Sequence, residues 1–214
     1  PMGEMLSYKE ITDIKNLLVL PEMQQSLESE FKAFKQAEEE ADKKRITLDV
    51  GPETHFRMAQ ILGYLDKPQD ALTYLLKSCS GNQGEYNAQQ LALKCVLESQ
   101  LHTQLQRKND GLRWWLFEEE VKKRILKFKT ASMNTLEELR KVDGDGSQFR
   151  KSKILVTAWQ GNLDAAKRML LELRDSDKEN PNIQFETARL ASQLCRACFA
   201  YNYKFHLKWN KEIC

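Results

Sequence analysis

Residues 55–78 constrain the fold of this chain most, because they carry two apolar stripes separated by a break. Their sequence is HFRMAQILGYLDKPQDALTYLLKS. In each half, apolar residues recur at the spacings of three and four that mark one face of a helix. They are Met58, Ala59, Leu62 and Leu65 in the first half, and Ala71, Leu72, Leu75 and Leu76 in the second. Between the halves, Pro68 cannot continue an established helix but suits the first turn of a new one. The stretch therefore predicts two antiparallel helices joined by a tight turn.

This stretch resembles a tetratricopeptide repeat (TPR), a pair of helices that occupies about 34 residues. The family's characteristic small and large apolar positions are filled here by Ala59, Leu62, Ala71, Leu75 and Ser78. His55 stands where the family usually has tryptophan. The resemblance implies that the helix before the turn is helix A of a repeat and that the helix after it is helix B.

A second stretch, GNLDAA at residues 161–166, is similar to the family's turn into helix B. The preceding helix A departs from the family pattern, with Ile154 where a small residue belongs and Thr157 where a large one does. Ala71 and Ala166, which would open the two B helices, lie 95 residues apart. That separation is not a whole number of repeats, so the resemblance implies an irregular array.

The composition favours helices along the whole chain. Only 9 of the 214 residues are glycine and 5 are proline, and no long run of β-branched residues has a period of two. We expect an all-α fold, specifically an irregular TPR-like α-solenoid of about nine or ten helices. Residues 1–214 would form one domain, and would be part of a longer protein because residues 208–214 stop inside an expected helix. The expected parts are N-terminal helices in 1–50, the best repeat in 51–80, long irregular helices in 84–142 and a second repeat region in 147–214.

Several helix starts are marked by local signals. Ser7 and Glu10 form a capping box, in which each side chain accepts a hydrogen bond from the other residue's backbone N–H. Pro52 would occupy the first turn of the helix that opens the best repeat. Asn180 would cap another helix, with Pro181 in its first turn.

The middle of the chain predicts long helices of unequal length. One is expected over residues 86–106, and another over residues 113–129. Thr135 and Glu138 form a further capping box. This box predicts a short separate helix that ends near Val142.

Residues suited to catalysis or to metal binding do not occur in the required patterns. The sequence has no GxGxxG, GxxxxGK, GxSxG or HExxH motif. Its odd number of cysteines, 5, argues against a framework of disulfides. Cys195 and Cys198 have the spacing of a redox or zinc half-site, but they fall inside an expected helix and have no second ligand pair. The DGDG sequence at 143–146 lacks the first and last ligands of a calcium loop. We expect no enzyme activity, no cofactor and no metal site.

The expected helix over residues 113–129 has a strongly basic side. This candidate basic surface consists of Lys122, Lys123, Arg124, Lys127 and Lys129. A basic amphipathic helix can bind a membrane surface, an acidic partner or nucleic acid. It can equally be a packed helix whose lysine stems lie along the core while their charges reach water. The acidic residues at 118–120 would repel phosphates, which weighs against nucleic acid.

The resemblance implies a module that binds another protein or a peptide. Stacked helix pairs leave a continuous concave surface lined by the A helices, and in the TPR family the peptide contacts come chiefly from helix A. Carried over to this sequence, the partner-binding places are Phe56, Gln60 and Tyr64 in the first unit and Lys151, Leu155 and Trp159 in the second. Tyr64 and Trp159 can equally pack against a neighbouring helix. The lysine and asparagine that some family members use to hold a C-terminal carboxylate are absent, so no binding of chaperone tails is expected.

Two other functional classes fit the same sequence. The chain can be the non-catalytic helical region of a larger enzyme, where it would position or regulate a catalytic domain. It can also bind nucleic acid through residues 113–129, in which case affinity would fall steeply with salt. The chain can also self-associate, because the uncovered ends of helical arrays expose apolar surface. With no stretch approaching the roughly 20 apolar residues that span a bilayer, and no leader, we expect an intracellular protein, cytoplasmic or nuclear.

Overall fold

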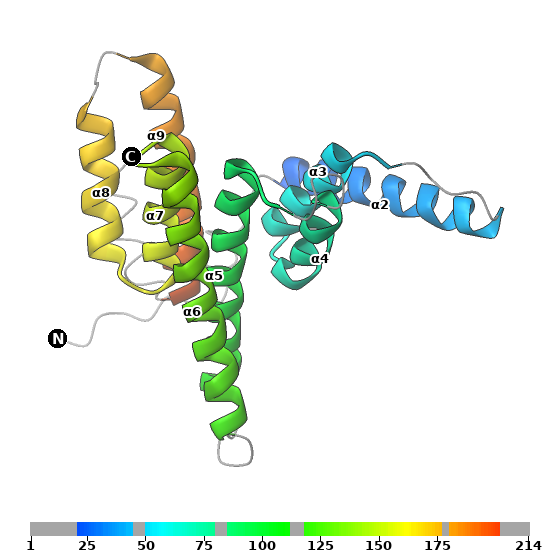
Figure 1. Ribbon diagram of the computed structural model, residues 1–214, viewed down its shortest axis with the longest axis horizontal. Helices are drawn as coiled ribbons and strands as arrows, with labels where there is room; N and C mark the ends of the chain where they lie inside the picture. The colour runs from blue at the N-terminus through cyan, green and yellow to red at the C-terminus, as the bar shows by residue number, and fades with distance from the viewer. Residues whose placement is uncertain (1–20, 45–49, 80–84, 112–117, 177–179, 202–214) are drawn as a thin grey trace.

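The structure is a computed structural model that describes residues 21–44, 50–79, 85–111, 118–176 and 180–201. These ranges are helical apart from short turns, so the expected all-α fold is confirmed for them (Figure 1). Eight helices occur in this part of the chain, namely α2 (Pro21–Lys43), α3 (Pro52–Tyr64), α4 (Pro68–Ser78), α5 (Ala88–Gly111), α6 (Glu118–Asp143), α7 (Ser147–Trp159), α8 (Leu163–Ser176) and α9 (Pro181–Tyr201). None of them is long and apolar enough to cross a membrane.

The predicted helix pair is present as α3 and α4, which begin at Pro52 and Pro68. The turn closes where the backbone N–H of Lys67 donates to the carbonyl of Leu62 at 2.9 Å. The two helices pack closely because the residues that face each other include Ala59 and Ala71, neither of which is exposed. Helix α2 lies against this pair through Leu27, Phe31 and Phe34.

Helices α5 and α6 form a long antiparallel hairpin, of which one end projects as an arm beyond the other helices (Figure 1). The short separate helix predicted to start at Thr135 is wrong, because α6 runs without a break from Glu118 to Asp143. The Thr135 hydroxyl does not cap a helix start. It donates to the Glu98 carboxylate of α5 at 2.8 Å, and both residues are buried. A contact between helices thus uses the group that the local pattern assigned to a cap.

The buried Glu98 carboxylate makes stability depend on pH. Burial raises the pKa of Glu98 above its ordinary value, against the opposing effects of Thr135 and Lys94. The folded protein therefore holds this proton to higher pH than the unfolded chain, so its contribution to stability falls as pH rises above the ordinary value of 4.5. We expect Glu98→Gln, which can still accept from Thr135, to raise Tm by about 2–4 °C at neutral pH.

Thermal unfolding followed by circular dichroism measures this effect. The gain in Tm from Glu98→Gln should shrink toward about pH 4, where the Glu98 carboxyl of the wild type becomes protonated in the folded and the unfolded state. Glu137→Gln is the matched control, since Glu137 is exposed on α6. A gain in Tm that does not vary with pH would contradict the assignment to the Glu98 charge.

The C-terminal part of the molecule is a second packed unit made by α7, α8 and α9. Its core includes Leu170 and Leu194, which are almost fully buried. The predicted cap at Asn180 is confirmed, because its side-chain oxygen accepts from the backbone N–H of Asn182 at 3.0 Å. Helix α9 starts at Pro181, as expected. The DGDG turn is also local, since the Asp143 carboxylate accepts from the backbone N–H of Phe149 at 2.9 Å.

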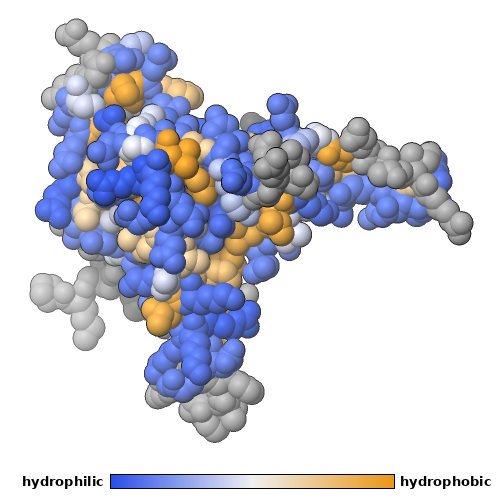
Figure 2. All heavy atoms as spheres, viewed as in Figure 1, coloured by the Kyte–Doolittle hydropathy of each residue, from blue (hydrophilic) through white to orange (hydrophobic). Residues whose placement is uncertain are grey.

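The described ranges hold fewer helices than the nine or ten expected for the whole chain. Eight lie in the described ranges, and one reason for the lower number is that the two helices predicted within residues 113–142 are one helix, α6. The helix predicted after Ser7 and the last helix predicted near the C-terminus lie outside the described residues. On the face drawn in Figure 2, hydrophilic residues cover α2 and the arm, and hydrophobic residues gather toward the middle.

Candidate functional site

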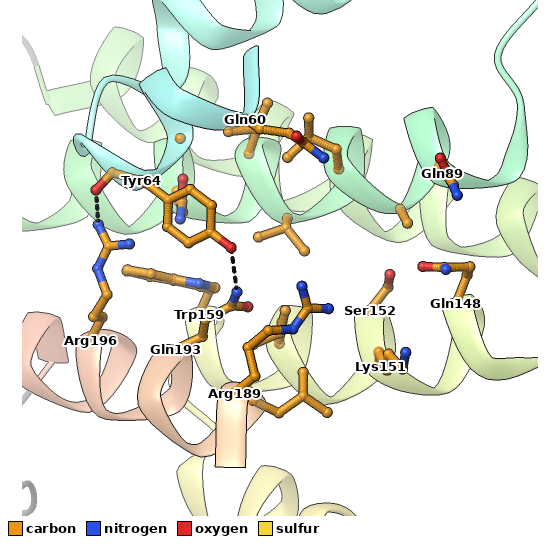
Figure 3. Close-up of a pocket in the computed structure, with 18 of the residues that line it drawn as sticks. Gln60, Tyr64, Gln89, Gln148, Lys151, Ser152, Trp159, Arg189, Gln193 and Arg196 are labelled. Atoms are coloured by element: carbon orange, nitrogen blue, oxygen red, sulfur yellow. Dashed lines mark hydrogen bonds between the residues drawn. The ribbon is translucent and has the colours of Figure 1, made fainter. Parts of the chain in front are cut away.

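A cleft of about 300 Å³ lies between four helices, α3, α5, α7 and α9. Figure 3 shows side chains from these helices converging on it. Helix α5 forms its floor through a stripe spaced by three or four residues, which comprises Gln89, Ala92, Leu93, Val96, Leu97 and Gln100. Gly63 of α3 also lines the cleft, and its Cα leaves so little room that an added Cβ would lie 3.0 Å from Leu97. The close approach of α3 to α5 thus sets one edge of the cleft.

All six residues that the sequence proposed for partner binding line this cleft. Phe56, Gln60 and Tyr64 reach it from α3, and Lys151, Leu155 and Trp159 reach it from α7. Their spacing of four residues on each helix keeps them on one face. The structure therefore brings together two sets of residues that are 95 positions apart in the sequence.

Sequence reasoning missed the residues from α5 and α9. Those from α9 are Arg189, Leu190, Gln193 and Arg196. Their spacing of three and four was available in the sequence, and a helix starting at Pro181 was already expected. The register of α9 could not be assigned, because the chain has no turn beside this helix that matches the family.

Tyr64 connects α3 to α9 across the cleft. Its hydroxyl accepts a hydrogen bond from the Gln193 side chain at 3.4 Å, and its backbone carbonyl accepts one from the Arg196 guanidinium at 2.6 Å (Figure 3). Trp159, by contrast, is 5% exposed, and its backbone carbonyl accepts from the Thr103 hydroxyl of α5. Trp159 is thus mainly a packed residue with one edge in the cleft, whereas Tyr64 is half-buried.

The cleft carries basic side chains and amides. Lys151 and Arg189 both contact the same carboxylate oxygen of Glu186, each at 3.0 Å. Burial lowers the pKa of Arg196, and the nearby charge of Asp66 opposes this. No aspartate or glutamate occurs among the described residues that line the cleft. An anionic group would therefore enter a positively charged environment.

Gln100 holds an unused acceptor at the floor of the cleft. Its side-chain oxygen is buried and accepts no hydrogen bond from the described residues, and the residue is only 6% exposed. A buried polar atom without a partner costs free energy. Four more glutamines line the same cleft, at positions 60, 89, 148 and 193. The site is thus rich in groups that can pair with a peptide backbone.

The candidate basic surface lies away from the cleft. Lys122, Lys123, Arg124, Lys127 and Lys129 are all exposed on the half of α6 that belongs to the arm (Figure 1). Leu126, on the same stretch, is 62% exposed. The helix therefore presents both charged and apolar side chains to solvent, and it does not contribute to the cleft.

The cysteines whose side chains are described are buried, at positions 79, 95 and 195. Burial raises the pKa of Cys95 to about 12, so this thiol is neutral at pH 7. Within the described ranges, no group of three or more His, Cys, Asp or Glu side chains is arranged to hold a metal ion. In comparisons with known proteins, no family model, curated protein or solved structure matches this chain.

Proposed function

We propose that this chain is a non-catalytic interaction module that binds a peptide segment of a partner protein in the cleft between α3, α5, α7 and α9. The proposal includes the fold, an irregular TPR-like array in which these four helices are the A helices. The observation that carries it is an alternation along the chain. Every second helix from α3 onward lines the cleft, and none of the described lining residues comes from α4, α6 or α8.

This alternation is what a stack of helix pairs predicts. In such a stack the first helix of each pair faces a shared concave surface, and the second helix covers the outside. The contacts agree with three pairs followed by a single helix, since α3 packs on α4, α5 on α6 and α7 on α8. The long α5–α6 pair between two shorter ones accounts for the irregular spacing of the repeat signals.

The chemistry of the lining also favours a peptide. Aromatic and apolar side chains, such as Phe56 and Leu93, can hold a ligand side chain, while glutamine amides can pair with backbone N–H and C=O groups. Small-molecule sites combine apolar walls with a few polar groups in a similar way. The cleft is, however, bordered by four helices along their length, which suits an extended chain better than a compact molecule.

The test is selection of short random peptides on the purified protein, followed by calorimetric titration of the selected peptides. We expect the double variant Phe56→Ala/Tyr64→Ala to bind the selected peptides more weakly by about 2 kcal/mol, or roughly 30-fold in affinity. Both side chains are half-buried, so the variant should stay folded. Leu76→Ala, on the outer side of the same helix pair and 63% exposed, is the control and should bind normally. Equal affinity of all three proteins would refute binding in the cleft.

A further inference from the structure

We infer that the peptide bound in the cleft is acidic, with two carboxylates that pair with Arg189 and Arg196. This inference rests on the proposed function and specifies its partner. The ligand would be an internal acidic segment in extended conformation. It would present backbone N–H and C=O groups to the glutamines that line the cleft and side-chain carboxylates to α9.

The first argument is the distribution of charge. Acidic and basic residues are nearly equal over the chain, at 31 and 33. The described lining of the cleft departs from this balance, because it contains Lys151, Arg189 and Arg196 but no carboxylate. Charges of one sign in a concave site focus the potential and attract a ligand of the opposite sign. The excess of positive charge is therefore a property of the cleft and not of the whole protein.

The second argument is the shortage of carboxylates for these cations. Lys151 and Arg189 share one oxygen of Glu186, which lies beside the cleft and does not line it. One carboxylate cannot satisfy the donors of two cations, since a guanidinium alone has five N–H groups. Arg189 is half-exposed, so a second carboxylate can approach it from the cleft. A bidentate pair with that group would be a charge-assisted contact.

The third argument is Arg196, which is partly buried near the opposite end of the cleft. Its described hydrogen bond is to the backbone carbonyl of Tyr64, and Asp66, whose charge acts on it from nearby, forms no ion pair with it within the described residues. A charge that is removed from water and held by a neutral carbonyl gains most from an anion brought by a ligand. Figure 3 shows Arg189 and Arg196 on α9, with Gln193 between them.

The positions of the two arginines define a spacing for the ligand. They are seven residues apart on α9, which corresponds to about 10 Å along the helix axis. An extended peptide in the polyproline II conformation covers this distance in about three residues, and its three residues per turn place both acidic side chains on the same side. Between its two acidic residues, the backbone groups would face Gln193, which lies between the two arginines on α9 (Figure 3).

The experiment is the same selection of random peptides, carried out in parallel on the wild type and on Arg189→Glu. We expect peptides from the wild type to contain two acidic residues about three positions apart. Replacing either acid by its amide should weaken binding by about 10-fold or more, and high salt should weaken it further. The Arg189→Glu protein should no longer enrich the acid that faces position 189. Arg168→Glu, exposed on α8 and outside the cleft, is the matched control and should select the wild-type peptides.

The outcomes separate the two proposals. If selected peptides depend on Phe56 and Tyr64 but carry no acidic pattern, the acidic ligand is refuted and the peptide-binding cleft stands. If no selected peptide depends on those residues, the cleft itself is refuted. If sedimentation shows that the protein self-associates, and Arg189→Glu abolishes this, the occupant is a segment of a second copy and not a partner peptide. Circular dichroism of each variant confirms that it is folded.

Discussion

Replacing Leu75 by alanine is expected to lower the free energy of unfolding by about 3 kcal/mol. Leu75 is fully buried in α4 and belongs to the same core cluster as Leu62 and Leu97. Alanine removes most of the apolar side chain and leaves a cavity, because helices on several sides prevent the site from collapsing. Chemical denaturation followed by circular dichroism measures the loss.

The adjacent residue provides the control for this experiment. Leu76 is 63% exposed on the same helix, so Leu76→Ala should change the free energy of unfolding by less than about 0.5 kcal/mol. The two variants have the same chemical change and nearly the same position in the sequence. A comparable loss of unfolding free energy in both variants would mean that α4 presents a different face to the core.

Replacing Gly63 by leucine is expected to cost about 2–3 kcal/mol through overpacking. A Cβ at this position would lie 3.0 Å from the Leu97 side chain, which is itself fully buried. Leucine is a better helix former than glycine, so any loss must come from the contact between α3 and α5. The same side chain would also occupy part of the cleft, so peptide binding should be lost together with stability.

Gly51 offers the matched substitution at an open position. It precedes α3, and a Cβ added there would have no neighbour within 4 Å. Gly51→Leu should cost at most about 1 kcal/mol, from the weaker capping preference of leucine. If Gly63→Leu is no more destabilising than Gly51→Leu, then α3 and α5 do not meet as closely as the cleft requires. Chemical denaturation curves of the Gly63→Leu and Gly51→Leu variants measure the difference.

The sequence predicted the elements whose signals are local. Pro52 and Pro68 mark the starts of α3 and α4, and Asn180 marks the start of α9, because each signal acts within one helical turn. Which apolar residues are buried was predicted less well. Leu76 was placed on the same stripe as Leu75 but is mostly exposed, since a stripe wider than the contacting surface leaves its edge in solvent.

The length of α6 could not be predicted from the same kind of signal. A capping box fits the start of a helix, but Thr135 and Glu138 can also lie within one. The choice depends on Glu98, which lies 37 positions earlier and accepts the hydrogen bond of Thr135. A pattern of four residues carries no information about such a distant partner.

For the cleft, sequence reasoning placed residues from two helices and missed the other two. Phe56, Gln60 and Tyr64 were found because the turn after α3 fixes the register of that helix. Arg189 and Arg196 were missed because the family resemblance does not extend to them. The positive charge of the cleft was also hidden, since it arises only when side chains from α7 and α9 meet.

Helix α5 has a further consequence for how the molecule loses its structure. Within the described residues it contributes to three apolar clusters. Leu97 belongs to the core that α5 shares with α3 and α4, and Cys95 belongs to a cluster that it shares with α6 and α7. Val96 packs at the edge of the core formed by α7, α8 and α9. In a simple stack, each helix pair touches only its neighbours, and the ends can open independently. Here the separation of any cluster exposes part of α5, which favours cooperative unfolding of the parts that it joins. Because α5 is also the floor of the cleft, a bound ligand would hold all of these parts together at once.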